Sequence, residues 1–174
     1  MQVGRHSYGV DRICIWSYGS DAQLSIGAFC AIADNVQVYL GGSHRVDWVT
    51  TYPFGHINQD IFNNFDGKGH PSTKGDVRIE NDVWIASNVT IMSGVTISSG
   101  AVIANNAHVV RDVAPYSIVG GNPAQLLRYR FDRETVARLL KVAWWDWPDE
   151  KINAHVKLLC NPDIEKFLEE AEKK

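Results

Sequence analysis

Aliphatic side chains recur at every sixth position through the second half of the chain. The series that begins at Ile79 contains only β-branched residues: Ile79, Ile85, Ile91, Ile97, Ile103 and Val109. An α-helix needs apolar spacings of three and four, and a half-buried strand needs simple alternation. A six-residue period instead predicts a chain that repeats one short strand and one turn, as a solenoid does.

A second apolar series follows four residues after the first and contains small or branched side chains: Val83, Val89, Val95, Ala101, Ala107 and Val113. Gly, Asn, Asp and Ser stand between the two series, and these residues suit tight turns. Three such units make one triangular coil of roughly 18 residues. Coils of this kind stack about 4.8 Å apart through parallel backbone hydrogen bonds. The sequence therefore predicts an all-β solenoid, a parallel β-helix.

The same period occurs earlier in the chain but is interrupted. Ile26, Ile32 and Val38 show it, and the next position of the series holds His44. The period resumes only at Ile79, out of step with the earlier frame. We therefore expect residues 43–76 to leave the coil as a projecting loop, and loops of this length in compact domains are usually functional.

The pattern changes again after Pro123 and becomes helical. Asp132 can cap a helix that runs from Arg133 to about Ala143, and Pro148 can start a second helix. We divide the chain into a β-helix over residues 1–124 and a helical appendage over residues 125–174. The appendage is expected to cover the exposed edge of the last coil, with its three tryptophans packed between helix and coil.

Composition narrows the class of partner. The formal net charge is -3, which gives no electrostatic basis for binding nucleic acid or an anionic membrane. No apolar stretch reaches the roughly 18 residues of a membrane span. The three cysteines show neither disulfide nor metal spacing, and no histidine–carboxylate pair has metal-ligand spacing. We expect a cytoplasmic protein without a metal.

Several stretches resemble the xenobiotic acetyltransferases, the branch of the hexapeptide-repeat family that includes the streptogramin and type-B chloramphenicol acetyltransferases. The resemblance runs from Ile26 to Asn161 and rests on residues 43–45, 51–54, 74–76, 81–85, 91–95, 115–124, 131–132 and 144–148. It implies that the β-helix is left-handed and that the chain forms a homotrimer. It also implies that acetyl-CoA is the donor and that the active sites lie between subunits.

His44 is the candidate catalytic residue. An imidazole titrates near neutral pH and can serve as a general base. His44 stands where the loop leaves the coil, and the resemblance aligns it with the catalytic histidine of the family. His56 and His70 also lie in the loop, where they either line the acceptor pocket or are exposed to solvent.

The acceptor pocket is expected to combine the loop with aromatic residues near the N-terminus. Aromatic faces suit both sugar rings and flat antibiotics, although packing between subunits is an alternative for each of them. A loop carboxylate can orient an acceptor or can simply be solvated. The candidates are Trp16, Tyr18, Trp48, Tyr52, Phe54 and Asp47.

The donor site is expected beside the later coils. The resemblance to related sugar acetyltransferases places contacts to the pantetheine and nucleotide at Ser87, Asn105, Val110, Arg111 and Arg128. Ser87 and Asn105 stand one coil apart, so they should stack on the same edge. The two arginines can pair with phosphates, and Trp84 can form a wall of the slot. Asn105 and Gln125 depart from those relatives.

These features predict transfer of an acetyl group from acetyl-CoA to a hydroxyl or amine of a small molecule, either a saccharide or an antibiotic. A non-catalytic trimer that serves as a scaffold is the main alternative. A γ-class carbonic anhydrase would need three zinc-binding histidines, and His44, His56 and His70 do not recur at coil spacing.

Overall fold

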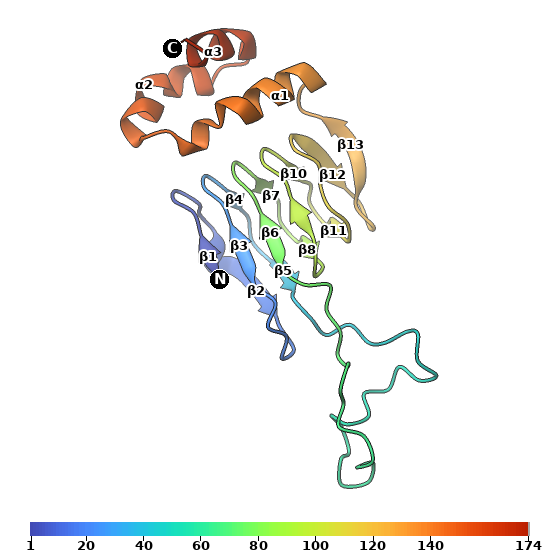
Figure 1. The fold of residues 1–174 in the computed structure, drawn as a ribbon. Coiled ribbons are helices and arrows are strands. Elements are labelled where there is room, and N and C mark those ends of the chain that lie inside the picture. Colours follow the sequence, from blue (N-terminus) through green and yellow to red (C-terminus); the bar gives the residue numbers. More distant parts are fainter. Residues whose placement is uncertain (174) are drawn as a thin grey trace.

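The chain winds through three sheets in turn, as the computed structural model of the protein shows for residues 1–173 (Figure 1). The sheet orders are β1-β3-β6-β9, β2-β5-β8-β11 and β4-β7-β10-β12-β13. All pairings between named strands are parallel except that of β12 with β13. The strands are β1 Gln2–Val3, β2 Ile13–Trp16, β3 Leu24–Ile26, β4 Ala31–Ile32, β5 Val36–Tyr39, β6 Val77–Ile79, β7 Trp84–Ile85, β8 Thr90–Ile91, β9 Thr96–Ile97, β10 Val102–Ile103, β11 His108–Val109, β12 Ser117–Gly120 and β13 Gln125–Tyr129.

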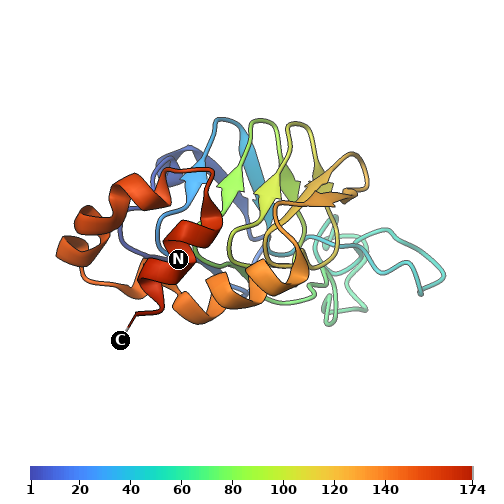
Figure 2. The same cartoon turned by 90° about the horizontal axis from the view of Figure 1, so that it is seen from above.

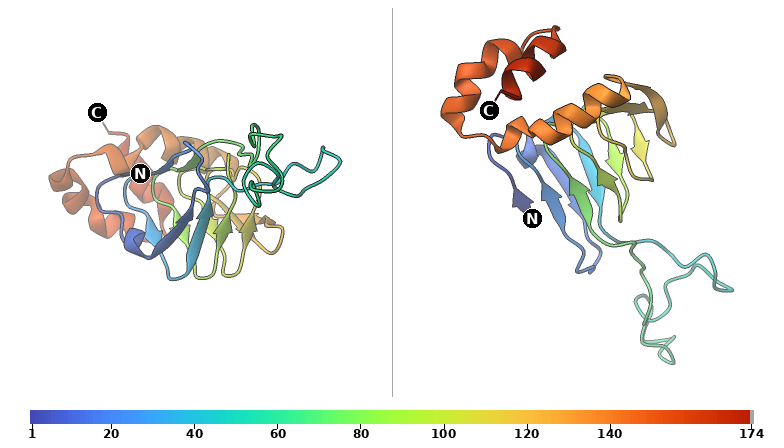
Figure 3. Two further views of the ribbon diagram at one scale, coloured as in Figure 1. Left: turned by 90° about the horizontal axis from the view of Figure 1, so that it is seen from below. Right: turned by 45° about the horizontal axis from the view of Figure 1, so that its top comes forward.

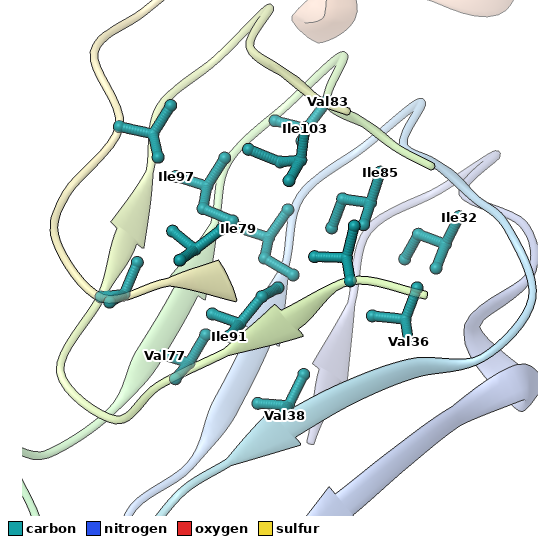
Figure 4. Close-up of a cluster of buried hydrophobic side chains, with 14 of the residues drawn as sticks. Ile32, Val36, Val38, Val77, Ile79, Val83, Ile85, Ile91, Ile97 and Ile103 are labelled. Atoms are coloured by element: carbon teal, nitrogen blue, oxygen red, sulfur yellow. The ribbon is translucent and has the colours of Figure 1, made fainter. Parts of the chain in front are cut away.

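The predicted six-residue period sets the register between neighbouring strands of these sheets. Ile79 pairs with Ile97, Ile85 with Ile103, and Ile91 with Val109, so each residue meets the one that is 18 positions further along. Both apolar series are buried, and their side chains point into the space between the sheets (Figure 4). Branched side chains fill this narrow axis because they pack well on a pleated surface.

Left-handed backbone conformations turn the chain from one sheet to the next. Asp82, Asn88, Gly94 and Gly100 all have positive φ, as their residue types suggested. Asn81 has another role, because its Oδ1 accepts a hydrogen bond from the backbone N–H of Ala28 at 2.8 Å. Side chains as well as backbone groups therefore join successive coils.

One coil carries the loop. Leu24 to Ile26 of β3 pair with Val77 to Ile79 of β6, so this circuit takes 53 residues where the next takes 18. Within residues 40–76, all of which the structure describes, the only β-bridge is the antiparallel one between Ser43 and Ser72. The loop leaves the stack on the side away from the C-terminal helices (Figures 1 and 3).

The three C-terminal helices are α1 Arg133–Val142, α2 Asp149–Leu159 and α3 Ile164–Ala171. The predicted cap is confirmed, because the side chain of Asp132 accepts a hydrogen bond from the N–H of Thr135 at 2.9 Å. None of the helices within residues 1–173 is long and apolar enough to cross a membrane.

The expected position of the appendage is wrong. At the open edge of the last coil it is β13 that pairs with β12, whereas the helices lie along one side of the stack (Figure 2). The cause is a row of aromatic side chains at one corner. Tyr116 in a late coil contacts Phe131 at 5.8 Å between ring centroids, and Phe29 in an early coil contacts Trp144 at 4.8 Å. The helices cover this row.

The axis should carry most of the stability. We expect Ile91→Ala, at a fully buried position, to lower the free energy of unfolding by about 2–5 kcal/mol, because the substitution leaves a cavity. Thr90→Ala, whose side chain points outward on the same strand, should change it by no more than about 0.5 kcal/mol. Urea unfolding at one protein concentration measures both, and equal effects would contradict the axial packing.

Candidate active site

His44 lies directly after Ser43, at the neck of the loop, where Ser43 and Ser72 meet. The neck is closed by two backbone hydrogen bonds, from Ser43 N–H to the Ser72 carbonyl at 3.1 Å and from Ser72 N–H to the Ser43 carbonyl at 2.7 Å. His44 Nδ1 lies 2.6 Å from the carbonyl oxygen of Thr51. Because a carbonyl only accepts, the proton is on Nδ1 and the lone pair is on Nε2. The imidazole is therefore held in the tautomer that a general base requires.

His70 lies beside His44, and His56 lies beside His70. The rings of His44 and His70 are 4.6 Å apart between centroids and meet at 88°. His56 Nε2 lies 2.6 Å from the carbonyl oxygen of His70, and the rings of His56 and His70 are 5.6 Å apart. No group of three or more His, Cys, Asp or Glu side chains within residues 1–173 is arranged to hold a metal ion.

His70 is the buried member of this cluster. Its exposed fraction is 7%, which excludes the expected alternative that it is a surface residue. Neither ring nitrogen has a hydrogen-bond partner among the described residues. Burial lowers the pKa of His70 below its usual value, and the neighbouring His44 and His56 lower it further. His70 therefore stays uncharged at neutral pH.

Four of the predicted acceptor residues gather in the loop. Asp47, Trp48, Tyr52 and Phe54 line a cavity of about 690 Å³ together with Phe62, Phe65 and their neighbours. Asp47 is a poor general base near neutral pH, because its hydrogen bonds with Arg45 lower its pKa to about 2. The guanidinium of Arg45 also lies 5.2 Å from the ring centroid of Trp48.

The other two predicted acceptor residues lie elsewhere. Trp16 stacks between Tyr18 and Tyr39, at centroid distances of 6.0 and 6.1 Å. Tyr18 lines a separate groove of about 620 Å³, which also contains His70 and the carboxylates of Asp21 and Asp76. The expected single pocket is therefore two, an aromatic cavity in the loop and a polar groove at its neck.

The predicted donor residues occupy the later coils. The N–H of Ser87 donates to Asn105 Oδ1 at 3.2 Å, which confirms that these residues stack one coil apart. Trp84 is 53% exposed, and the register aligns it with Val102, Ile118 and Arg128 across four neighbouring strands. Arg111 lines a cavity of about 190 Å³ with Gln125 and Tyr129 of β13, and Val110 precedes it in the chain.

Sequence reasoning missed a partly buried ionic cluster at the corner under the helices. Arg130 lies 3.4 Å from Asp82, donates to the Gly100 carbonyl at 2.7 Å, and stacks over Tyr116 at 5.1 Å. Burial raises the pKa of both Asp82 and Tyr116. Asp82 and Tyr116 lay inside recognised motifs, but nothing in those motifs indicated that the two residues meet.

Comparisons with known proteins agree with this architecture. The family described as bacterial transferase hexapeptide (six repeats) matches residues 76–111. A chloramphenicol acetyltransferase of Escherichia coli is 43% identical over 146 residues, which cover 82% of this chain and 68% of the relative. A probable macrolide acetyltransferase of Lysinibacillus sphaericus is 46% identical over 80% of this chain and 78% of its own. The chain belongs to the hexapeptide-repeat acetyltransferase family.

A relative of known structure has also been solved with acetyl coenzyme A bound. A hexapeptide-repeat acetyltransferase of Vibrio cholerae is 30% identical with a TM-score of 0.54, and the match covers 75% of this chain and 62% of that one. The chain thus spans less than two thirds of that protein. A second structure of the enzyme, complexed with acetyl coenzyme A, matches at 27% identity with a TM-score of 0.51 over 75% of this chain and 72% of that one.

Burial of the His70 imidazole should make the free energy of unfolding depend on pH. Since the pKa of His70 is lower in the folded chain, the unfolded chain binds more protons as the pH falls below about 6.5, and folding is destabilised there. We expect His70→Phe to lose less free energy of unfolding than the wild type between pH 7 and pH 5. Urea unfolding at several pH values measures this, and parallel curves would show that His70 does not titrate abnormally.

Proposed function

We propose that this protein transfers an acetyl group from acetyl-CoA to a hydroxyl or amine of a small acceptor, with His44 as general base. The observation that carries the proposal is the contact of His44 Nδ1 with the Thr51 carbonyl, which leaves Nε2 free to accept a proton. The names of the relatives support the reaction class.

The proposed reaction needs one residue that moves a proton in both directions. Nε2 of His44 takes the proton of the acceptor as its oxygen or nitrogen attacks the thioester carbonyl carbon. The tetrahedral intermediate then collapses and the carbon–sulfur bond breaks. The imidazolium returns the proton to the leaving thiolate, so the products are the acetylated acceptor and free CoA, and His44 is restored.

The donor is proposed to lie along the outer face of the sheet that contains β7, β10, β12 and β13. Trp84 and Arg128 stand at the two ends of one row across this face, three strand spacings or about 14 Å apart. An extended pantetheine arm suits such a row, with Ser87, Asn105 and Val110 beside it. Arg111 and Arg128 supply positive charge for phosphates. The Vibrio cholerae structure with acetyl coenzyme A supports this choice of donor.

The assembly is proposed to be a homotrimer of left-handed β-helices, as in the resemblance, with His44 between subunits. The division into residues 1–124 and 125–174 and the cytoplasmic location belong to the same proposal. Supporting the assembly, Val46, Val49, Ile61 and Phe62 of the loop are exposed in the single chain. Exposed apolar side chains gathered on a projecting loop mark a surface that another molecule covers.

The acceptor is proposed to be either an antibiotic or a saccharide, and different parts of the site favour each. The aromatic cavity lined by Trp48, Tyr52 and Phe54 suits a flat apolar acceptor, and the antibiotic names of the relatives agree with it. The polar groove beside Tyr18, Asp21 and Asp76 suits a hydroxyl-rich one.

Release of free thiol from acetyl-CoA tests the reaction. The panel contains amino sugars, nucleotide sugars, chloramphenicol and a virginiamycin-type compound. We expect His44→Ala to lower kcat by at least about 100-fold, because a general base contributes this much. Its oligomeric state and its Kd for acetyl-CoA should not change, and His155→Ala on α2 is the matched control. No thiol release with any acceptor would favour the scaffold alternative.

Arg128 tests the donor site separately. We expect Arg128→Ala to raise the Kd for acetyl-CoA about tenfold, because it removes a charge-assisted hydrogen bond to a phosphate, while the KM for the acceptor stays the same. Arg133→Ala at the start of α1 is the control. Calorimetric titration measures both, and equal Kd values in the two variants would remove Arg128 from the donor site.

A further inference from the structure

We propose that His70 is a positioning residue, which holds the imidazole of His44 through an edge-to-face contact between the two rings and not through its nitrogens. The inference rests on the proposed role of His44 as the base. It goes beyond that role because it gives a second histidine, which the proposed proton transfer does not use, the task of orienting the base.

The geometry of His44 requires a second contact. One hydrogen bond, from Nδ1 to the Thr51 carbonyl at 2.6 Å, fixes one atom of the ring but leaves the ring free to swing about that bond. The ring of His70 meets it at 88° and 4.6 Å between centroids. A perpendicular neighbour removes the swing, since rotating the His44 ring would lose the edge-to-face contact. The two contacts together direct Nε2.

His70 is itself firmly held. His56 Nε2 lies 2.6 Å from its carbonyl oxygen, and the Trp48 ring lies 6.3 Å away. The chain on its C-terminal side is fixed to the loop neck by the paired backbone bonds of Ser43 and Ser72. His70 therefore connects the neck to the side chain of His44, and its 7% exposure leaves little room for another rotamer.

The ring nitrogens of His70 show whether hydrogen bonding or ring shape positions His44. Both are buried, and neither has a hydrogen-bond partner within residues 1–173. A buried polar group without a hydrogen-bond partner destabilises a fold. Replacing it by an apolar group of similar shape is therefore neutral or stabilising. Because no described residue bonds these nitrogens, the shape of the ring is what His44 meets.

The charges around His70 also favour a neutral ring. It faces His44 and His56 in the cluster, and Arg45 lies beside Gly69 and is paired with Asp47. Asp21 and Asp76 line the same groove as His70 without a hydrogen bond to it. During turnover His44 becomes an imidazolium, and an uncharged aromatic ring beside it does not oppose that charge.

Two substitutions separate shape from hydrogen bonding. We expect His70→Ala to lower kcat 10- to 100-fold with no change in the Kd for acetyl-CoA, because the base loses its orientation. We expect His70→Phe, which retains a flat ring, to keep at least a third of the wild-type kcat and to unfold at an equal or higher urea concentration. The pH profile of kcat should keep the same shape in both variants.

Nitrogen NMR of histidine-labelled protein provides a readout that does not depend on activity. We expect His44 to show the Nδ1–H tautomer in all three proteins, because the Thr51 carbonyl still accepts that proton, and its ring signals to broaden through motion in His70→Ala but not in His70→Phe. His6, His108 and His155 are internal controls that should not change. A His70→Phe variant as inactive as His70→Ala, or unchanged His44 signals in His70→Ala, would overturn the inference.

The proposed function fails independently of this inference. If His44→Ala turns over like the wild type, the general-base role is wrong whatever His70 does. If His44→Ala is inactive and both His70 variants match the wild type, the base is retained and only the positioning role of His70 is lost.

Discussion

The stacking of one coil on the next is the constraint on which the rest of the structure depends. Each strand is only two to five residues long and cannot be stable alone. Stability comes from parallel hydrogen bonds to the coils on either side and from the branched side chains that meet along the axis. A fold held together in this way tolerates a long insertion at a turn, because the coils above and below keep their register.

The long loop between β5 and β6 is such an insertion. It leaves after β5 and returns before β6, and Leu24 to Ile26 still pair with Val77 to Ile79 although the intervening circuit is much longer than the next. The bridge between Ser43 and Ser72 closes the insertion directly beside His44. A rigid stack thereby carries an irregular segment whose backbone carbonyl, at Thr51, selects the tautomer of His44. The aromatic cavity lies within the loop, and the polar groove lies at its neck.

Much of the fold follows from local sequence, and the site follows only in part. The axis was predictable because the register of 18 residues is an exact multiple of the six-residue period. The placement of the helices was not, since it depends on Phe29 and Tyr116 at one corner of coils distant in sequence. The place of His44 at the start of the loop could be predicted from the break in the period, whereas its role as a base comes from the resemblance and stays a prediction. Thr51 could not, because a backbone carbonyl carries no side-chain signal. The burial of His70 also depends on contacts across the loop that no periodicity describes.

The central claim is that the loop presents Nε2 of His44 to the thioester while Thr51 holds Nδ1. A crystal structure of the assembled protein with coenzyme A bound tests it most directly. We predict that Nδ1 remains on the Thr51 carbonyl and that Nε2 faces the coenzyme sulfur across the space an acceptor would occupy. An imidazole turned away from the sulfur, or a coenzyme bound far from the neck of the loop, would contradict it.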